Sequence, residues 1–201
     1  MKKIIISAVL MIFCSLPVFA QGLYFDIGLG FGKGKTKIDG VDYYKFVKNL
    51  GFSPSQLGME FGLKAGYGPI GDMPLYIVGE YNSISHLIYE GSNFAQFNSY
   101  ILGPGVIYYP TSLIQLGTSI GFSWISNSSD YGTSSEKSKS GYAYNLYGAI
   151  DLGGTNHGCL IGLKYSYAKN NVELTGYPQW TQKQSLISVF VKYAYRSRAE
   201  E

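Results

Sequence analysis

The segment Gly22–Gly32, with the sequence GLYFDIGLGFG, carries the pattern that decides the fold. Large apolar side chains occupy every second position, at Leu23, Phe25, Ile27, Leu29 and Phe31. Glycine occupies the positions between them, apart from a tyrosine and an aspartate. Such strict alternation predicts a β-strand whose two faces meet different surroundings.

Seven further segments of similar length show the same kind of alternation. They are Leu57–Gly68, Leu75–Ile84, Phe97–Tyr109, Leu113–Ser126, Gly141–Leu152, His157–Ala168 and Gln184–Tyr195. The fourth strand of the resulting set of eight contains Pro104 between Gly103 and Gly105. Because proline has no N–H to give to the sheet, this position predicts a β-bulge.

The connections between these segments alternate in length. The long ones are Lys33–Gln56, Ser85–Gln96, Asn127–Ser140 and Lys169–Lys183, and the short ones are Pro69–Pro74, Pro110–Ser112 and Gly153–Asn156. Strands that run up and down between two compartments produce this alternation, with tight periplasmic turns and long outer loops. The predicted fold is therefore all-β, an eight-stranded antiparallel up-and-down transmembrane β-barrel.

Residues 1–20 have the features of a cleaved signal peptide. Lys2 and Lys3 precede the apolar run Ile4–Leu16, and Ala20 offers a small residue at the cleavage site. The run is short for a membrane-spanning helix. We therefore expect export, and residues 21–201 then form one outer-membrane β-barrel domain, with Cys159 as its single cysteine.

Composition agrees with a membrane barrel rather than with a soluble enzyme. Charged residues make up 14% of the chain, against about 25% in an average soluble domain. The formal net charge of +3 includes two lysines of the leader, so nothing in the charge balance indicates a nucleic-acid partner.

The few charged residues within the predicted strands are expected to face a barrel lumen. They are Asp26, Glu60, Lys64, Glu80, Asp151, Lys164 and Lys192. A soluble lipocalin-like barrel would place the polar face outward in water, and such a face should carry more charge than this. Inside a narrow lumen, opposite charges can pair with one another, and small residues leave room for them.

Aromatic residues near both ends of the strands are expected to form two girdles at the membrane surfaces. Tyr67, Tyr108, Tyr109, Tyr193 and Tyr195 fall near the short turns, and Trp124, Tyr142, Tyr165 and Tyr167 fall near the long loops. Lys33, Lys35 and Lys37 follow the first strand and are expected to meet anionic lipid headgroups at the membrane rim.

These features together resemble the family of small outer-membrane barrels that includes the OmpA membrane domain and OmpX, and OmpW-like barrels are a second possibility. The resemblance covers the whole mature chain and rests on the strand pattern, on the segment Leu102–Tyr109 and on the aromatic last strand Ile187–Tyr195. It implies outer-membrane lipids and the barrel-assembly machinery as partners. The chain departs from the family pattern because residues 196–201 follow the aromatic end of that strand.

The expected function is that of a non-enzymatic surface barrel with an envelope-structural or adhesion role, in which outer loops contact a host or cell-surface ligand. The candidate contact residues are Tyr43, Tyr44, Phe46, Phe94, Tyr131, Tyr177 and Trp180. One alternative is a narrow channel or carrier for small hydrophobic or ionic solutes, as in OmpW-like barrels.

A second alternative is a lipid-modifying enzyme. It would use His86 with Ser83 or Ser85, near Glu80 or Glu90. No motif supports it, and we expect neither catalytic residues, nor a cofactor, nor a metal site.

Overall fold

The computed structural model describes residues 22–71, 73–129, 137–138, 141–153, 156–173 and 179–196. The predicted signal peptide lies outside this part of the chain. The long strands are β1 (Leu23–Ile38), β3 (Ser55–Tyr67), β4 (Leu75–Glu90), β5 (Asn93–Thr111), β6 (Ile114–Ser129), β8 (Gly141–Asp151), β9 (His157–Glu173) and β10 (Trp180–Arg196). Shorter elements are β2 (Val41–Asp42), α2 (Tyr43–Asn49) and β7 (Lys137–Ser138). Among the described helical residues, none forms a helix long and apolar enough to cross a membrane.

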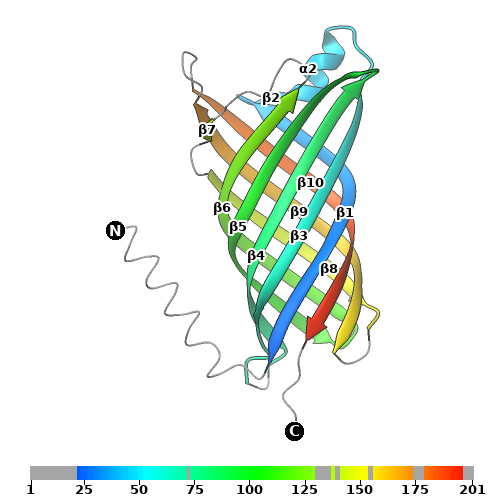
Figure 1. The fold of residues 1–201 in the computed structure, drawn as a ribbon, viewed down its shortest axis with the longest axis vertical. Helices are drawn as coiled ribbons and strands as arrows, with labels where there is room; N and C mark the ends of the chain where they lie inside the picture. The colour runs from blue at the N-terminus through cyan, green and yellow to red at the C-terminus, as the bar shows by residue number, and fades with distance from the viewer. Residues whose placement is uncertain are drawn as a thin grey trace, which may run out of the picture.

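The eight long strands form one closed antiparallel barrel, as the sequence predicts (Figure 1). Each strand pairs with the strands before and after it, and β10 pairs with both β9 and β1. Closure gives the strands a partner on both sides over the part of the barrel where they are all paired, which is what a lipid environment requires.

The barrel has two different ends. The connections β3–β4, β5–β6 and β8–β9 lie at one end, here called the turn end, and α2, β2 and β7 lie at the other, here called the outer end (Figure 1). In the long predicted connection Lys33–Gln56, helix α2 begins after Asp42, whose side chain accepts a hydrogen bond from the Lys45 N–H.

Side chains alternate between the outside and the inside of the barrel along every long strand. On β6, Ile120 and Phe122 point outward with 66% and 70% of their surface exposed, whereas Ser119 and Ser123 are buried. The apolar face that the sequence predicts for each strand is the outer face, and the face with Gly, Ser, Asn and paired charges is the inner one. This arrangement is the reverse of a soluble barrel.

The strands continue beyond the predicted ends toward the outer end, and one predicted loop is wrong. β4 and β5 stay paired up to Glu90 and Asn93, so Gly91 and Ser92 alone connect them in place of the expected loop Ser85–Gln96. Gly91 has a φ of +58°, which glycine adopts without strain. The connections therefore do not alternate strictly between long and short.

The predicted bulge at Pro104 is also wrong. Leu102 pairs with Phe122 and Gly105 pairs with Ser119, so the register between β5 and β6 stays the same across the proline. The missing N–H interrupts the pairing without inserting a residue. The register shift between these strands lies instead between Tyr108 and Thr111, next to the turn end.

Candidate functional site

The interior of the barrel holds a layer of six buried charged side chains, here called the charge layer. It consists of Asp26, Glu60, Lys64, Glu80, Lys164 and Lys192. The Asp26 carboxylate lies 3.1 Å from Lys64 Nζ and 3.4 Å from Lys192 Nζ. Lys64 Nζ also lies 4.1 Å from the centre of the Tyr147 ring. The inward face of the strands thus brings together groups from β1, β3, β8 and β10.

The second half of the charge layer is centred on Lys164. Its Nζ lies 2.8 Å from Glu80 Oε1 and 3.8 Å from Glu60 Oε2. Gly30 makes room for Glu60, because a Cβ at this position would lie 2.8 Å from Glu60 Cγ. Within the layer, three carboxylates face three ammonium groups, so the buried charge is balanced.

The predicted lumen charge Asp151 lies closer to the turn end, and its partner is a residue that the sequence did not indicate. Arg196 Nη2 lies 2.9 Å from Asp151 Oδ2, inside the barrel. The sequence placed Arg196 in a tail after the last strand, whereas β10 includes it. Arg196 follows Lys192 by four residues, so the alternation of a strand puts both side chains on the inward face. This spacing is the signal in the sequence that could have identified it.

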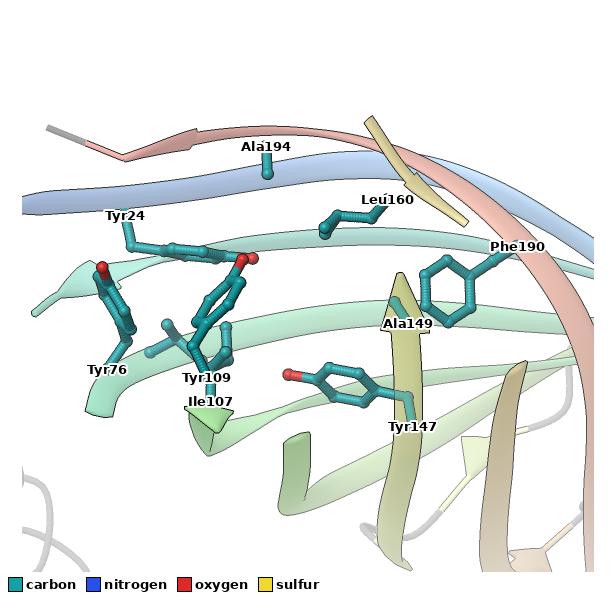
Figure 2. Close-up of a cluster of buried hydrophobic side chains, with 10 residues drawn as sticks. Tyr24, Tyr76, Ile107, Tyr109, Tyr147, Ala149, Leu160, Phe190 and Ala194 are labelled. Atoms are coloured by element: carbon teal, nitrogen blue, oxygen red, sulfur yellow. The ribbon is translucent and has the colours of Figure 1, made fainter. Parts of the chain in front are cut away.

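A chain of hydrogen bonds joins Asp151 to the charge layer. Tyr109 donates to Asp151 at 3.2 Å, and the Gln115 side-chain amide donates to the hydroxyls of Tyr109 and Tyr24 at 2.7 and 2.8 Å. Tyr24 in turn donates to Asp26 at 2.8 Å. Figure 2 shows that the rings of Tyr24, Tyr76 and Tyr109 lie close together in the interior, with Tyr76 in contact with the other two.

Tyr109 is therefore not part of an outer aromatic girdle, contrary to the prediction. It is 5% exposed and lies in the interior cluster. Tyr108 points outward, so the next residue in a strand must point inward. The other predicted girdle residues lie on the outer face: Tyr67, Tyr108, Tyr193 and Tyr195 toward the turn end, and Trp124, Tyr142, Tyr165 and Tyr167 on the half nearer the outer end.

Above the charge layer, amide and hydroxyl side chains fill the barrel. The Asn82 amide donates to Asn145 Oδ1 and to Ser166 Oγ, each at 3.3 Å, and Asn145 donates to Ser119 Oγ at 2.9 Å. Asp26, Lys64 and Asn82 are all 0% exposed. Because water does not reach these side chains, the described interior is a packed core at this height and not an open pore.

His86 lies beyond these layers, toward the outer end, and it is buried. Its Nδ1 accepts from Thr36 Oγ1 at 2.9 Å, and its Nε2 donates to Gln56 Oε1 at 3.1 Å. Burial lowers the pKa of His86 from 6.5 to about 4, so the imidazole is neutral at neutral pH.

The geometry does not support the catalytic alternative. Ser83 and Ser85 point to the outer face of β4, whereas His86 points inward. Glu80 forms a salt bridge with Lys164, and Glu90 Oε1 accepts a hydrogen bond from the Ser53 N–H. The alternation along the strand thus separates the proposed nucleophiles from the proposed base, and no substrate reaches a fully buried imidazole.

The outer end carries a set of exposed apolar side chains, here called the outer-end apolar patch. It consists of Val41, Phe46, Leu50, Phe52, Tyr89 and Phe94. A hollow of about 230 Å³ lies between α2 and the β4–β5 hairpin, with Phe46, Leu50, Phe52, Tyr89 and Phe94 among its lining residues. The Tyr43 ring anchors α2, because it packs edge-on against Phe97 at 4.9 Å between ring centres.

The structure brings only some of the predicted contact residues together. Tyr43, Phe46 and Phe94 line the hollow, and Tyr44 lies on the other side of α2 among lysines. Trp180 is the first residue of β10 and is half-buried. Tyr131 and Tyr177 lie outside the described residues. Leu50 and Phe52 were not predicted, because isolated apolar residues in a loop carry no periodic signal.

Comparisons with known proteins identify the fold. No protein-family model and no curated protein sequence matches the chain. Ail, the attachment invasion locus protein of Yersinia pestis in complex with the heparin analogue sucrose octasulfate, matches with a TM-score of 0.51 and 16% identity over 87% of this chain and 99% of that chain. Neisserial surface protein A matches with a TM-score of 0.51 and 17% identity over 85% of this chain and 95% of that chain. The chain thus has the fold of the small eight-stranded outer-membrane barrels, as the resemblance implied.

Proposed function

We propose that this chain is a non-enzymatic barrel of the outer membrane, exported by a cleaved signal peptide, that acts at the cell surface through its outer end. The observation that carries the proposal is the combination of an apolar outer wall, a filled interior and an exposed apolar patch beside a hollow at the outer end. Each part argues against a different alternative role.

The outer wall fits a lipid bilayer. On β6 the outward apolar side chains run from Ile114 to Trp124. A strand of about ten residues, tilted by about 40°, covers roughly 25 Å along the membrane normal, which matches the apolar band of outer-membrane barrels. A water-soluble protein would leave this whole wall exposed to solvent.

The interior argues against the channel alternative. The charge layer and the amide layer above it consist of paired, buried side chains from seven different strands. Opening a path would leave several of these charges without partners, at a cost of several kcal/mol each. Function is therefore expected at the ends of the barrel, and the turn end carries only short connections.

The outer-end apolar patch supports a contact role. Phe46, Leu50 and Phe52 are 47%, 60% and 51% exposed, in α2 and the segment that follows it, beyond the apolar wall. Exposed apolar groups that gather around a hollow are typical of surfaces that bind another molecule. The attachment role in the name of Ail makes a host surface the first class of ligand to test for this chain.

The test compares intact cells that display the wild-type chain with cells that display Phe46→Ser/Leu50→Ser/Phe52→Ser, and measures adhesion to cultured epithelial cells. We expect adhesion to fall by about tenfold, because such contacts carry most of a binding energy. Asn49→Ala/Ser53→Ala/Ser55→Ala changes polar positions of the same end and serves as the control. Equal adhesion of all three cell types would overturn the contact role, provided that each barrel keeps its heat-modifiable mobility in gel electrophoresis.

A further inference from the structure

The surface lysines of the described chain gather in one sector of the barrel. Lys64, Lys164 and Lys192 lie in the interior, and all the other lysines whose side chains the structure describes belong to β1, α2, β9 and β10. They are Lys33, Lys35, Lys37, Lys45, Lys48, Lys169 and Lys183, here called the lysine sector. Within the described residues, the outward faces of β3, β4, β5, β6 and β8 contribute none.

Strand pairing places these lysines side by side. Lys37 is the register partner of Lys183, which is in turn the partner of Lys169, so three lysine positions form a row across β1, β10 and β9. Lys35 lies opposite Ser185, one step closer to the apolar wall. Like charges in directly opposite positions are destabilising in a sheet. Asp42 of β2 is the other register partner of Lys37, so a bound anion would offset the repulsion that remains toward Lys183 and Lys169.

Two hollows open between the lysines. One, of about 420 Å³, is lined by Lys33, Lys35, Lys45 and Lys48 together with Tyr44 and Gln56. The other, of about 230 Å³, is lined by Lys35, Lys37 and Lys183. Asp42 lies within the sector and forms a salt bridge of 3.4 Å with Lys35, which offsets only part of the positive charge.

An apolar groove continues from the hollows down the outer wall. It has a volume of about 630 Å³, and Leu116, Leu146, Gly148 and Leu163 lie along it. Tyr165 and Ile187 line both this groove and the larger lysine hollow. Gly148 keeps the groove open, because the nearest atom to a Cβ at this position would be Leu116 Cδ2 at 3.4 Å.

We propose that this surface binds a phosphorylated lipid of the outer leaflet, with its phosphate groups among the lysine sector and an acyl chain along the groove at Gly148. The inference rests on the proposed function, in which the outer end faces the exterior. Basic hollows that share residues with an apolar groove fit an amphiphile better than a soluble polyanion, which would use the lysines alone. Each lysine near an anionic surface contributes a similar increment of attraction, so the row acts additively.

The first test measures binding of diphosphorylated lipid A to the purified full-length barrel in a neutral detergent, by native mass spectrometry. Lys35→Gln/Lys37→Gln/Lys183→Gln should weaken binding on the order of a hundredfold. The control Gln96→Glu/Asn98→Asp/Ser126→Asp makes the same change in net charge on β5 and β6, away from the lysine sector, and should bind within about twofold of wild type. Equal affinities of the two variants would overturn the lysine part of the proposal.

The second test addresses the groove. Gly148→Leu fills it, and should weaken binding of intact lipid A by about tenfold while leaving binding of the deacylated glycan phosphate unchanged. If the deacylated form or inorganic phosphate binds wild type as tightly as intact lipid A does, the site takes a free anion and the lipid assignment is wrong. Tighter binding of a sulfated polysaccharide than of lipid A would overturn it as well.

A separate measurement keeps this inference apart from the proposed function. Surface accessibility of α2 on intact cells, measured for the same variants, reports whether the barrel is inserted with its outer end outward. An inserted barrel without preference for the phosphorylated lipid contradicts the inference alone, whereas a barrel that is not inserted contradicts the proposed function.

Discussion

At the scale of single residues, glycines decide which large side chains the narrow interior accepts. Gly117 lies in register with Tyr147, and a Cβ at Gly117 would lie 2.0 Å from Tyr147 Cζ. The ring of Tyr147 therefore occupies the space that any other residue at 117 would fill. Tyr147 in turn lies beneath Lys64, so the glycine supports the charge layer.

We predict that Gly117→Val destabilises the barrel by about 1–3 kcal/mol, because the valine displaces a packed ring. Urea unfolding in detergent, followed by tryptophan fluorescence, measures the change. Gly148→Ala is the matched control, since the same addition on the outer face meets its first atom at 3.4 Å and should cost less than about 1 kcal/mol. Equal effects of the two substitutions would contradict the packing described here.

His86 makes stability depend on pH. The pKa of His86 in the folded barrel is lowered to about 4 by burial, against an ordinary value of 6.5, and the facing groups are Thr36, Gln56 and Asp42. Protonation therefore favours the unfolded chain. The contribution is complete above pH 6.5 and is lost as the pH falls toward 4.

We predict that wild type loses about 2–3 kcal/mol more stability than His86→Gln between pH 7 and pH 4. The midpoints of urea unfolding, measured for both proteins over this pH range, give the difference in stability. The acidic residues are the same in both proteins, so their contributions to the pH dependence cancel. Parallel pH profiles of the two proteins would show that the folded barrel accepts a proton at His86 as easily as the unfolded chain does.

At the scale of strands, the sequence predicted the parts that face lipid and missed the parts that extend beyond it. In the apolar wall one face is apolar and the other is small or polar, which produces a clear alternation. Near the outer end of β4 and β5, positions such as Ser85, Gln96 and Asn98 are polar and point outward, so the alternation disappears while the strand pairing continues. For this reason the sequence indicated a loop where a hairpin exists.

For the interior charges too, the sequence predicted which side chains face inward but not how they pair. The seven predicted lumen charges follow from strand phase alone, and all of them lie inside. The pairing of carboxylates with lysines depends on the stagger of strands that are distant in sequence, such as β4 and β9. A pattern of neighbouring residues in the sequence does not predict this stagger. The predictions for Arg196 and Tyr109 were wrong because each lies at the end of a strand. Continuing the inward and outward alternation to these two positions puts both side chains inside the barrel.

Lys164 joins strands on opposite sides of the interior, because it lies on β9 and faces Glu60 of β3 and Glu80 of β4. We predict that Lys164→Met destabilises the barrel by about 3–5 kcal/mol, since it leaves two buried carboxylates without a cation. Adding Glu60→Gln and Glu80→Gln should restore most of the loss. Equilibrium unfolding of the single and triple variants tests this, and a triple variant as unstable as the single one would contradict the pairing.

At the scale of the whole molecule, the packed layers predict a barrel that does not conduct. Wild-type protein reconstituted in planar bilayers should show no steady single-channel current, because water does not reach Asp26, Lys64 and Asn82. Stable conductance steps that change size in Asn82→Asp would instead place an ion path through the amide layer and favour the channel role.

The most direct test of the account is the orientation of the barrel in living cells. Leu50, at the end of α2, and Met73, in the β3–β4 connection, are 60% and 58% exposed at opposite ends. With Cys159→Ser as background, single cysteines at these positions are treated with a membrane-impermeant maleimide on intact cells. We expect labelling at position 50 alone, and labelling at position 73 only after the outer membrane is permeabilised. Labelling at 73 but not at 50, or at neither position in a protein that osmotic shock releases, would contradict a barrel that presents its outer end at the cell surface.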